Sequence, residues 1–191
     1  DMDGTLLDLA YDDFIWNHCL PERHAQVHQY SLEQSKNTLF EFYQQHKHTL
    51  SWYSSAFWTA KVGVDVLQLQ HEHRDKIRAR KGCFELLNQL KAKGFRCWLL
   101  TNADRAGLKL KLENVPLSSY FEVMISSEEL GHAKEDVAFW QKLQQLHPFD
   151  PSQAVFVDDT VVVLQGAESF GISQLISILH PSSDKLARVA S

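Results

Sequence analysis

The sequence predicts an α/β protein, built on a doubly wound parallel sheet and interrupted by an all-helical insert. After residue 82, short β-rich runs alternate with amphipathic helical segments across short turns, as in parallel sheets with crossover helices. Residues 9–80 differ, because they are nearly free of glycine, rich in aromatic residues, Gln and His, and spaced as helices. We therefore expect a core domain of residues 1–8 and 81–191 and a helical cap domain of residues 9–80.

Composition restricts the class of protein. A chain of 191 residues with 44% hydrophobic and 23% charged residues is an ordinary soluble globular protein that can bury one core and an accessory unit. The net charge of −5 argues against a nucleic-acid partner, though local cations could still hold a small phosphorylated substrate. Three distant cysteines without a Cys-x-x-Cys pair indicate reduced thiols and a cytoplasmic location. No apolar run reaches the roughly 18 residues that a membrane span needs.

Helical periodicity and cap signals locate the helices of the insert. Ser31 with Gln34 three positions later forms a capping-box signature for a helix that continues to about His46. An earlier helix is expected to end before Pro21, and a later one at Gly63. The expected helices span residues 11–18, 31–46, 52–62 and 65–74.

The second part of the chain is expected to supply the sheet. Strands are expected at residues 95–100, 122–125, 154–157 and 172–178, and helices at residues 83–93, 106–113 and 160–170. A further helix is expected after Lys134, marked by Phe139, Trp140, Leu143 and Leu146. Residues 108–112 alternate Leu and Lys as a strand would, but their spacing also fits a helix. We favour the helix, because parallel strands need a crossover connection.

The first eight residues, Asp-Met-Asp-Gly-Thr-Leu-Leu-Asp, carry the strongest chemical signal. Asp1 and Asp3 stand two positions apart, and Gly4 permits a sharp turn directly after them. A carboxylate beside a second, protonatable carboxylate suits nucleophilic attack followed by proton transfer. An acidic turn or a calcium loop is the alternative, but the EF-hand pattern needs an acidic residue or Asn where Thr5 stands.

Four groups of polar side chains fall at strand ends, the first of them after a strand expected to precede Asp1, and ligands of open parallel sheets bind at those carboxyl ends. Taken singly, each group is better explained as a helix cap or a solvated helix start. Taken together in this order, they indicate one site in which several carboxylates require a hard cation, for which Mg²⁺ is the natural candidate. The groups are Asp1 with Asp3, Thr101 with Asn102, Lys134, and Asp158 with Asp159.

These groups resemble the four motifs of the haloacid dehalogenase (HAD) superfamily of phosphohydrolases. The matching stretches are residues 1–5, 99–102, 131–134 and 155–159, and the insert is placed like that superfamily's cap. In such proteins a hydrophobic strand precedes the first aspartate, so we expect this sequence to be a segment of a longer chain. The resemblance implies a Rossmann-like core and phosphate-ester chemistry.

Roles for the motif residues are implied by the same resemblance. Asp1 would be the nucleophile that forms an aspartyl-phosphate, and Asp3 would be the acid for the leaving group and then the base for water. Thr101, Asn102 and Lys134 would contact the substrate phosphate. The metal ligands would be Asp1, the Asp3 carbonyl and Asp158, supported by Asp159. The aspartate at position 3 favours a phosphatase over a dehalogenase.

The sequence of the cap suggests the class of substrate. Several of its stretches, such as Pro21-Glu22 and Phe57-Trp58, closely resemble the bacterial GMP/IMP nucleotidases, which implies a purine nucleoside monophosphate. Trp58 is a candidate for stacking on the base, and the alternative is that it packs against a neighbouring cap helix. A HAD phosphatase for a sugar phosphate or another small metabolite is the second hypothesis. A non-catalytic binding protein is the third, and the intact Asp1, Asp3 and Lys134 speak against it.

Overall fold

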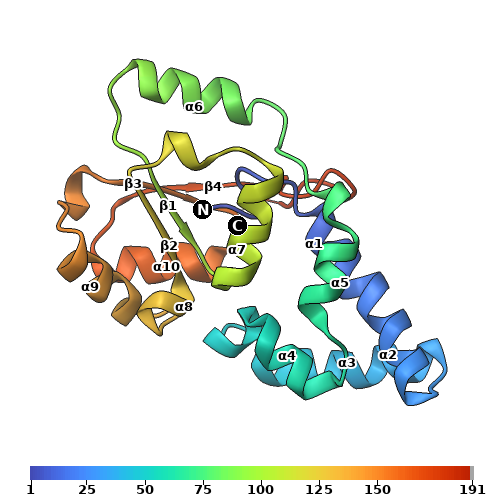
Figure 1. Cartoon of the computed structure of the whole chain (residues 1–191). Helices are drawn as coiled ribbons and strands as arrows, with labels where there is room; N and C mark the ends of the chain where they lie inside the picture. The colour runs from blue at the N-terminus through green and yellow to red at the C-terminus, as the bar shows by residue number, and fades with distance from the viewer. Residues whose placement is uncertain (190–191) are drawn as a thin grey trace.

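A computed structural model describes residues 1–189 and confirms the α/β fold with helices inserted after the first loop. We call residues 9–80, which contain helices α1–α5, the cap, and the other described residues the core; Figure 1 shows the cap at one end of the molecule and the strands at the other. The cap consists of α1 Ala10–Phe14, α2 Leu20–His28, α3 Leu32–His46, α4 Ser55–Val62 and α5 Val66–Glu72. The core consists of α6 Cys83–Ala92, β1 Trp98–Thr101, α7 Arg105–Asn114, β2 Val123–Ser126, α8 Ser127–Leu130, α9 Val137–Leu146, β3 Val155–Asp158, α10 Val161–Phe170 and β4 Gln174–Ser177.

The predicted capping box is present at the start of α3. The Ser31 side chain accepts a hydrogen bond from the Gln34 backbone, and the Gln34 side chain accepts one from the Ser31 backbone. Gly63 ends α4 in a left-handed conformation, also as predicted.

The prediction that Pro21 closes the first cap helix is wrong. The helical path runs from α1 through a π-helical turn at Ile15–Cys19 into α2, and Pro21 lies in the first turn of α2. Proline is tolerated there because its missing N–H coincides with a register change, at which the regular α-helical bonds are already interrupted.

The strands form two parallel pairs. Trp98 of β1 lies opposite Val123 of β2, and Val155 of β3 lies opposite Gln174 of β4. Helix α7 connects the first pair and α10 the second, which confirms a helix over residues 106–113. Within residues 1–189 the backbone ladders do not join these pairs into one continuous sheet, unlike the prediction. The Asp1 backbone nitrogen lies 3.2 Å from the Val157 carbonyl oxygen, so the N-terminal loop rests against β3.

Two clusters of buried side chains stabilise this arrangement. One cluster surrounds Trp140, where Phe139 and Phe156 pack against the indole between α9 and β3. The other runs from Met2 in the first loop into the cap, where it includes Trp58. The first loop is therefore packed between core and cap. Over the described residues, none of the helices combines the length and the apolar character that crossing a bilayer demands.

Candidate active site at the carboxyl ends of the strands

The first loop turns back on itself and fixes the Asp1 carboxylate. The Gly4 N–H donates to the Leu7 carbonyl at 2.8 Å, and the Thr5 hydroxyl donates to Asp1 Oδ2 at 2.7 Å. Gly4 has φ +80°, and a Cβ at this position would lie 2.7 Å from the carboxyl carbon of Asp159. A glycine is therefore required both by the backbone conformation and by the close approach of Asp159.

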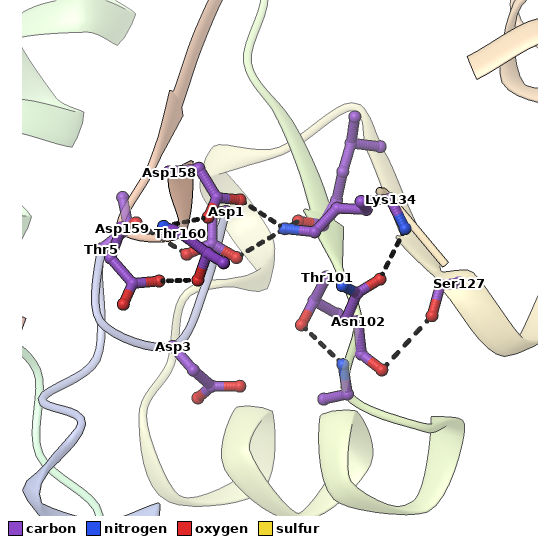
Figure 2. A network of polar contacts seen from close by, with 12 residues as sticks. Asp1, Asp3, Thr5, Thr101, Asn102, Ser127, Lys134, Asp158, Asp159 and Thr160 are labelled. Atoms are coloured by element: carbon purple, nitrogen blue, oxygen red, sulfur yellow. Dashed lines mark hydrogen bonds and ion pairs between the residues drawn. The ribbon is translucent and has the colours of Figure 1, made fainter. Parts of the chain in front are cut away.

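Lys134 joins the carboxyl ends of the two strand pairs. Its Nζ lies 2.8 Å from Asp1 Oδ1, 2.7 Å from Asp158 Oδ2 and 3.2 Å from the Leu100 carbonyl oxygen of β1 (Figure 2). The lysine is only 2% exposed, so its charge must be matched by the carboxylates beside it. The structure thus brings together three groups that the sequence placed in separate motifs.

Asp1, Asp158 and Asp159 form a group with the character of a cation site. Each offers an oxygen atom, and these atoms lie within 4.8 Å of one another. Burial raises the pKa of Asp159, and Asp158 adds to this, while the Arg188 guanidinium, 3.1 Å from Asp159 Oδ2, acts in the opposite direction. A set of carboxylate oxygens fits Mg²⁺, which prefers hard oxygen ligands. The Asp3 side chain is not in this group, and the part expected of its carbonyl stays a prediction.

Asn102 supports Lys134 through the backbone. Its Oδ1 accepts from the Lys134 N–H at 2.9 Å, and its Nδ2 donates to Glu135 Oε2 at 2.9 Å. Thr101 is almost fully buried, and its Oγ1 accepts from the Ala103 N–H at 3.1 Å. Both residues therefore lie at the end of β1, as predicted. Asn102 orders the Lys134 loop, and the contact of either residue with a phosphate stays a prediction.

Gly166 lets helix α10 approach that loop closely. A Cβ at Gly166 would lie 2.6 Å from the Lys134 carbonyl oxygen and 2.7 Å from the Glu135 carbonyl oxygen. Both of these are backbone atoms, which cannot rotate away as a flexible side chain can. The sequence alone does not single out this residue, because a glycine inside a helical pattern gives only a weak signal.

Asp3 points away from the other motif carboxylates (Figure 2) and contacts Lys111, a lysine that the sequence alone does not single out. Lys111 of α7 places Nζ 2.7 Å from Asp3 Oδ1, and 2.8 and 2.9 Å from the two carboxylate oxygens of Asp12 in the cap. Burial alone would lower the pKa of Lys111, but Asp12 and Asp3 outweigh it and raise the pKa above its ordinary value. The lysine is therefore charged at neutral pH.

A cavity of about 420 Å³ lies between cap and core. The core side of its wall carries the motif residues Asp1, Asp3, Asn102, Lys134, Asp158 and Asp159. The cap side carries aromatic and amide side chains, namely Trp16, Asn17, Tyr43, Trp52, Tyr53 and Gln70. This volume lies in the usual range for small-molecule sites. The predicted carboxylates and cation therefore face a cavity between cap and core.

The structure does not support Trp58 as a residue that stacks on a substrate base. Although it backs the cavity wall, it is 0% exposed, and its indole N–H donates to the Trp52 carbonyl at 2.8 Å. Its ring packs edge-on against Trp16, Tyr43 and Trp52. The structure thus favours the packing alternative over stacking on a substrate. The half-buried Trp16 and Trp52 are the indoles that remain accessible from the cavity.

Two polar contacts hold the cap against the core beside the cavity. The Ser55 backbone N–H and hydroxyl both donate to Asp104 Oδ2, each at 2.6 Å. The Tyr53 hydroxyl donates to Glu135 Oε1. Glu135 follows Lys134 directly, so the position of the cap is linked to the loop that carries the lysine.

Comparisons with known proteins agree with this geometry. A model of the haloacid dehalogenase-like hydrolases matches residues 1–176. The GMP/IMP nucleotidase YrfG of Escherichia coli strain K12 is 31% identical over 183 residues, which cover 96% of this chain and 82% of that protein. The pyrophosphatase PpaX of Bacillus mycoides is 23% identical over 175 residues, covering 90% of this chain and 78% of that protein.

Solved structures share the fold. A HAD phosphatase from Thermococcus onnurineus superimposes with a TM-score of 0.79 at 19% identity, covering 92% of this chain and 83% of that one. The magnesium-bound HAD-hydrolase YfnB from Bacillus subtilis gives a TM-score of 0.64 at 16% identity, covering 91% and 84%. The family model and the 31% identical relative show that the chain belongs to the haloacid dehalogenase-like hydrolases.

Proposed function

We propose that this hydrolase is a magnesium-dependent phosphomonoesterase that acts through an aspartyl-phosphate, with purine nucleoside 5′-monophosphates such as GMP and IMP as substrates. The observation that carries the reaction is the contact of Asp1 with Lys134, 2.8 Å apart, at the wall of the cavity between cap and core. A carboxylate held beside a cation can attack a phosphorus atom whose oxygens the same cation attracts.

The first half-reaction forms a bond between an Asp1 carboxylate oxygen and phosphorus and breaks the bond from phosphorus to the ester oxygen. Asp3, entering this step protonated, gives its proton to the departing alkoxide and so releases an alcohol. Lys134 lies between Asp1 and Asp158 and is placed to neutralise phosphoryl charge. Thr101 and Asn102, at the end of β1, complete the expected phosphate contacts.

The second half-reaction uses the same carboxylates. Asp3, now ionised, takes a proton from a water molecule that attacks phosphorus, and the bond from Asp1 to phosphorus breaks to release inorganic phosphate. Asp1, Asp158 and Asp159 would hold Mg²⁺, which offsets the negative charge of the phosphoryl group and the surrounding carboxylates when bound. The closed cap would exclude other water from the intermediate.

The proposed preference for purine nucleotides depends on the cap. Support comes from the relative named GMP/IMP nucleotidase and from the flat side chains on the cap side of the cavity. Trp16 and Trp52 are half-buried there and offer faces or edges to a base, whereas Trp58 does not. Stacking of a base on an aromatic ring contributes about 1–3 kcal/mol in nucleic-acid complexes.

A substrate panel tests this proposal. Phosphate release is measured with GMP, IMP, AMP, pyrimidine nucleotides, sugar phosphates and p-nitrophenyl phosphate, in the presence of Mg²⁺ and after chelation. We expect the highest kcat/KM for GMP or IMP and no turnover without the metal. If a sugar phosphate is the best substrate, the nucleotidase assignment is wrong and only the phosphatase assignment remains. If no phosphomonoester releases phosphate, both assignments are refuted.

A further inference from the structure

We infer that Lys111 is a positioning residue for the general acid–base Asp3, and that Asp12 of the cap holds Lys111 in place. This inference rests on the proposed phosphomonoesterase function. It assigns a part in the reaction to two residues that lie outside the motif stretches.

The contacts of Lys111 account for its place inside the protein. The residue is 5% exposed, and its Nζ lies within 2.7–2.9 Å of one Asp3 oxygen and both Asp12 oxygens. A buried ammonium is stable only when it is paired, and carboxylates on two sides satisfy it. The side chain is thus fixed by its partners and cannot turn out to solvent without leaving both carboxylates unpaired.

These three residues come from three parts of the fold. Asp3 lies in the nucleophile loop, Lys111 on α7 of the core, and Asp12 on α1 of the cap. The Tyr11 ring lies 5.7 Å from the Lys111 ammonium, and the Tyr11 hydroxyl donates to the Gln70 carbonyl of α5 at 2.8 Å. The ammonium therefore meets the catalytic loop on one side and the cap helices on the other.

The pairing distinguishes the two oxygens of Asp3. Lys111 holds Oδ1, so Oδ2 is the oxygen left to give and accept the proton in the two half-reactions. A carboxylate free to rotate would have to find this orientation in each half-reaction, and fixing such a group contributes to rate through pre-organisation. Asp12 contacts Nζ through both of its oxygens and so holds the lysine in place beside Asp3.

A purely structural salt bridge is the competing explanation, because a buried pair can often be replaced without loss of function. The two explanations differ in their dependence on the leaving group. A nucleoside leaving group needs the proton from Asp3, whereas p-nitrophenolate departs without one. Loss of a positioning residue must therefore affect nucleotide turnover selectively, while a structural defect affects both substrates alike.

The experiment compares Lys111→Met, Lys111→Arg, Asp12→Asn and Asp3→Asn with the unchanged protein on GMP and on p-nitrophenyl phosphate. We expect Lys111→Met to lower kcat on GMP at least about tenfold, with KM and p-nitrophenyl phosphate turnover changed less than about threefold. Lys111→Arg should recover part of the loss, and Asp12→Asn should lose less than Lys111→Met. Lys109→Met, on the exposed side of the same helix, is the matched control and should leave both activities unchanged.

A double variant completes the test. Asp3→Asn with Lys111→Met should be no slower on GMP than Asp3→Asn alone, because both changes remove the same proton transfer. Equal losses on both substrates, or additive losses in the double variant, would overturn the inference. If Lys111→Met does not fold, as judged by thermal unfolding, the same comparison with Lys111→Gln decides, because a side chain without the charge that left the substrate ratio unchanged would count against positioning. If the unchanged protein hydrolyses neither substrate, the proposed function itself fails.

Discussion

The Tyr53 hydroxyl of the cap donates a hydrogen bond to the Glu135 carboxylate of the core. The other carboxylate oxygen of Glu135 accepts from Asn102, whose own Oδ1 holds the Lys134 N–H. The cap is therefore connected by one chain of hydrogen bonds to the backbone of Lys134. The position of the cap and the order of the Lys134 loop are linked in this structure.

Replacing Tyr53 with Phe tests this connection. A hydrogen bond to a charged acceptor contributes about 1.5–3 kcal/mol, and its loss weakens the closed arrangement relative to the open one. We expect KM for the nucleotide to rise about three- to tenfold, with a smaller change in kcat on p-nitrophenyl phosphate. Tyr30→Phe removes a hydroxyl from an exposed tyrosine of the cap and is the control. An unchanged KM would show that the contact does not govern closure.

Replacing Asp1 with Asn removes the proposed nucleophile but keeps the size of the side chain. Loss of a catalytic nucleophile lowers turnover by about 10⁴-fold or more, and the amide also loses its charge pairing with Lys134. We expect no measurable phosphate release from any phosphomonoester, while circular dichroism shows a folded protein. Asp184→Asn changes an exposed aspartate near the C-terminus and should retain full activity. Substantial turnover by Asp1→Asn would exclude the aspartyl-phosphate route.

The sequence was sufficient to bring most of the candidate site together because each motif is contiguous in the chain. Asp158 ends β3 and Thr101 ends β1, so local pattern and sheet geometry together placed them at one edge. The buried Lys134 between Asp1 and Asp158 is consistent with the same pattern. These positions required no knowledge of how the cap packs.

The contacts that cross between cap and core could not be predicted in this way. Tyr53 and Glu135 are 82 positions apart, and Lys111 and Asp12 are 99 positions apart. Lys109 and Lys111 look alike in the sequence, and only the tertiary fold exposes one and buries the other. For Trp58 the sequence left stacking on a base and packing within the cap as alternatives, and only the tertiary contacts with Trp16 and Tyr43 distinguish them.

Binding of Mg²⁺ should be measurable without an activity assay. A ligand present at one hundred times its Kd stabilises the folded state by about 2.7 kcal/mol, which raises Tm by roughly 5–10 °C for a chain of this size. We expect such a shift with Mg²⁺, and its loss in Asp158→Asn, because Asp158 belongs to the carboxylate group that would hold the ion. Asp184→Asn should retain it. An equal shift in Asp158→Asn would place the ion elsewhere.

The stability of the cap should depend on pH through His24. This histidine is buried on α2, its Nδ1 lies 2.9 Å from the Ser35 hydroxyl, and that hydroxyl donates to the Pro21 carbonyl. Burial, aided by His28, lowers the pKa of His24 below its ordinary value of 6.5. The folded protein therefore favours neutral His24. The contribution of neutral His24 to the free energy of unfolding is present above pH 6.5 and is lost as the pH falls through the lowered pKa.

Thermal unfolding measured between about pH 7.5 and pH 5 checks this dependence, in the range where histidine titrates. We expect Tm to fall with pH, and the fall to be smaller in His24→Gln, which has no group that titrates there. His18→Gln alters an exposed histidine of the cap and should keep the full dependence. An identical slope in His24→Gln and in the unchanged protein would show that another group is responsible.

Replacing Gly166 with Ala tests how tightly α10 packs against the Lys134 loop. Alanine is favoured over glycine by up to about 1 kcal/mol inside a helix, so an unhindered site would gain stability from this change. At Gly166 the added methyl group would lie 2.6 Å from the Lys134 carbonyl oxygen, and either the helix or the loop must move. We expect a loss of about 1–3 kcal/mol in the free energy of unfolding, as for other overpacked sites, and a lower kcat as Lys134 is displaced from Asp1.

Gln165→Ala, on the exposed face of the same helix, should be nearly neutral in both measurements. A Gly166→Ala protein as stable and as active as the unchanged one would show that the loop position is not set by this contact.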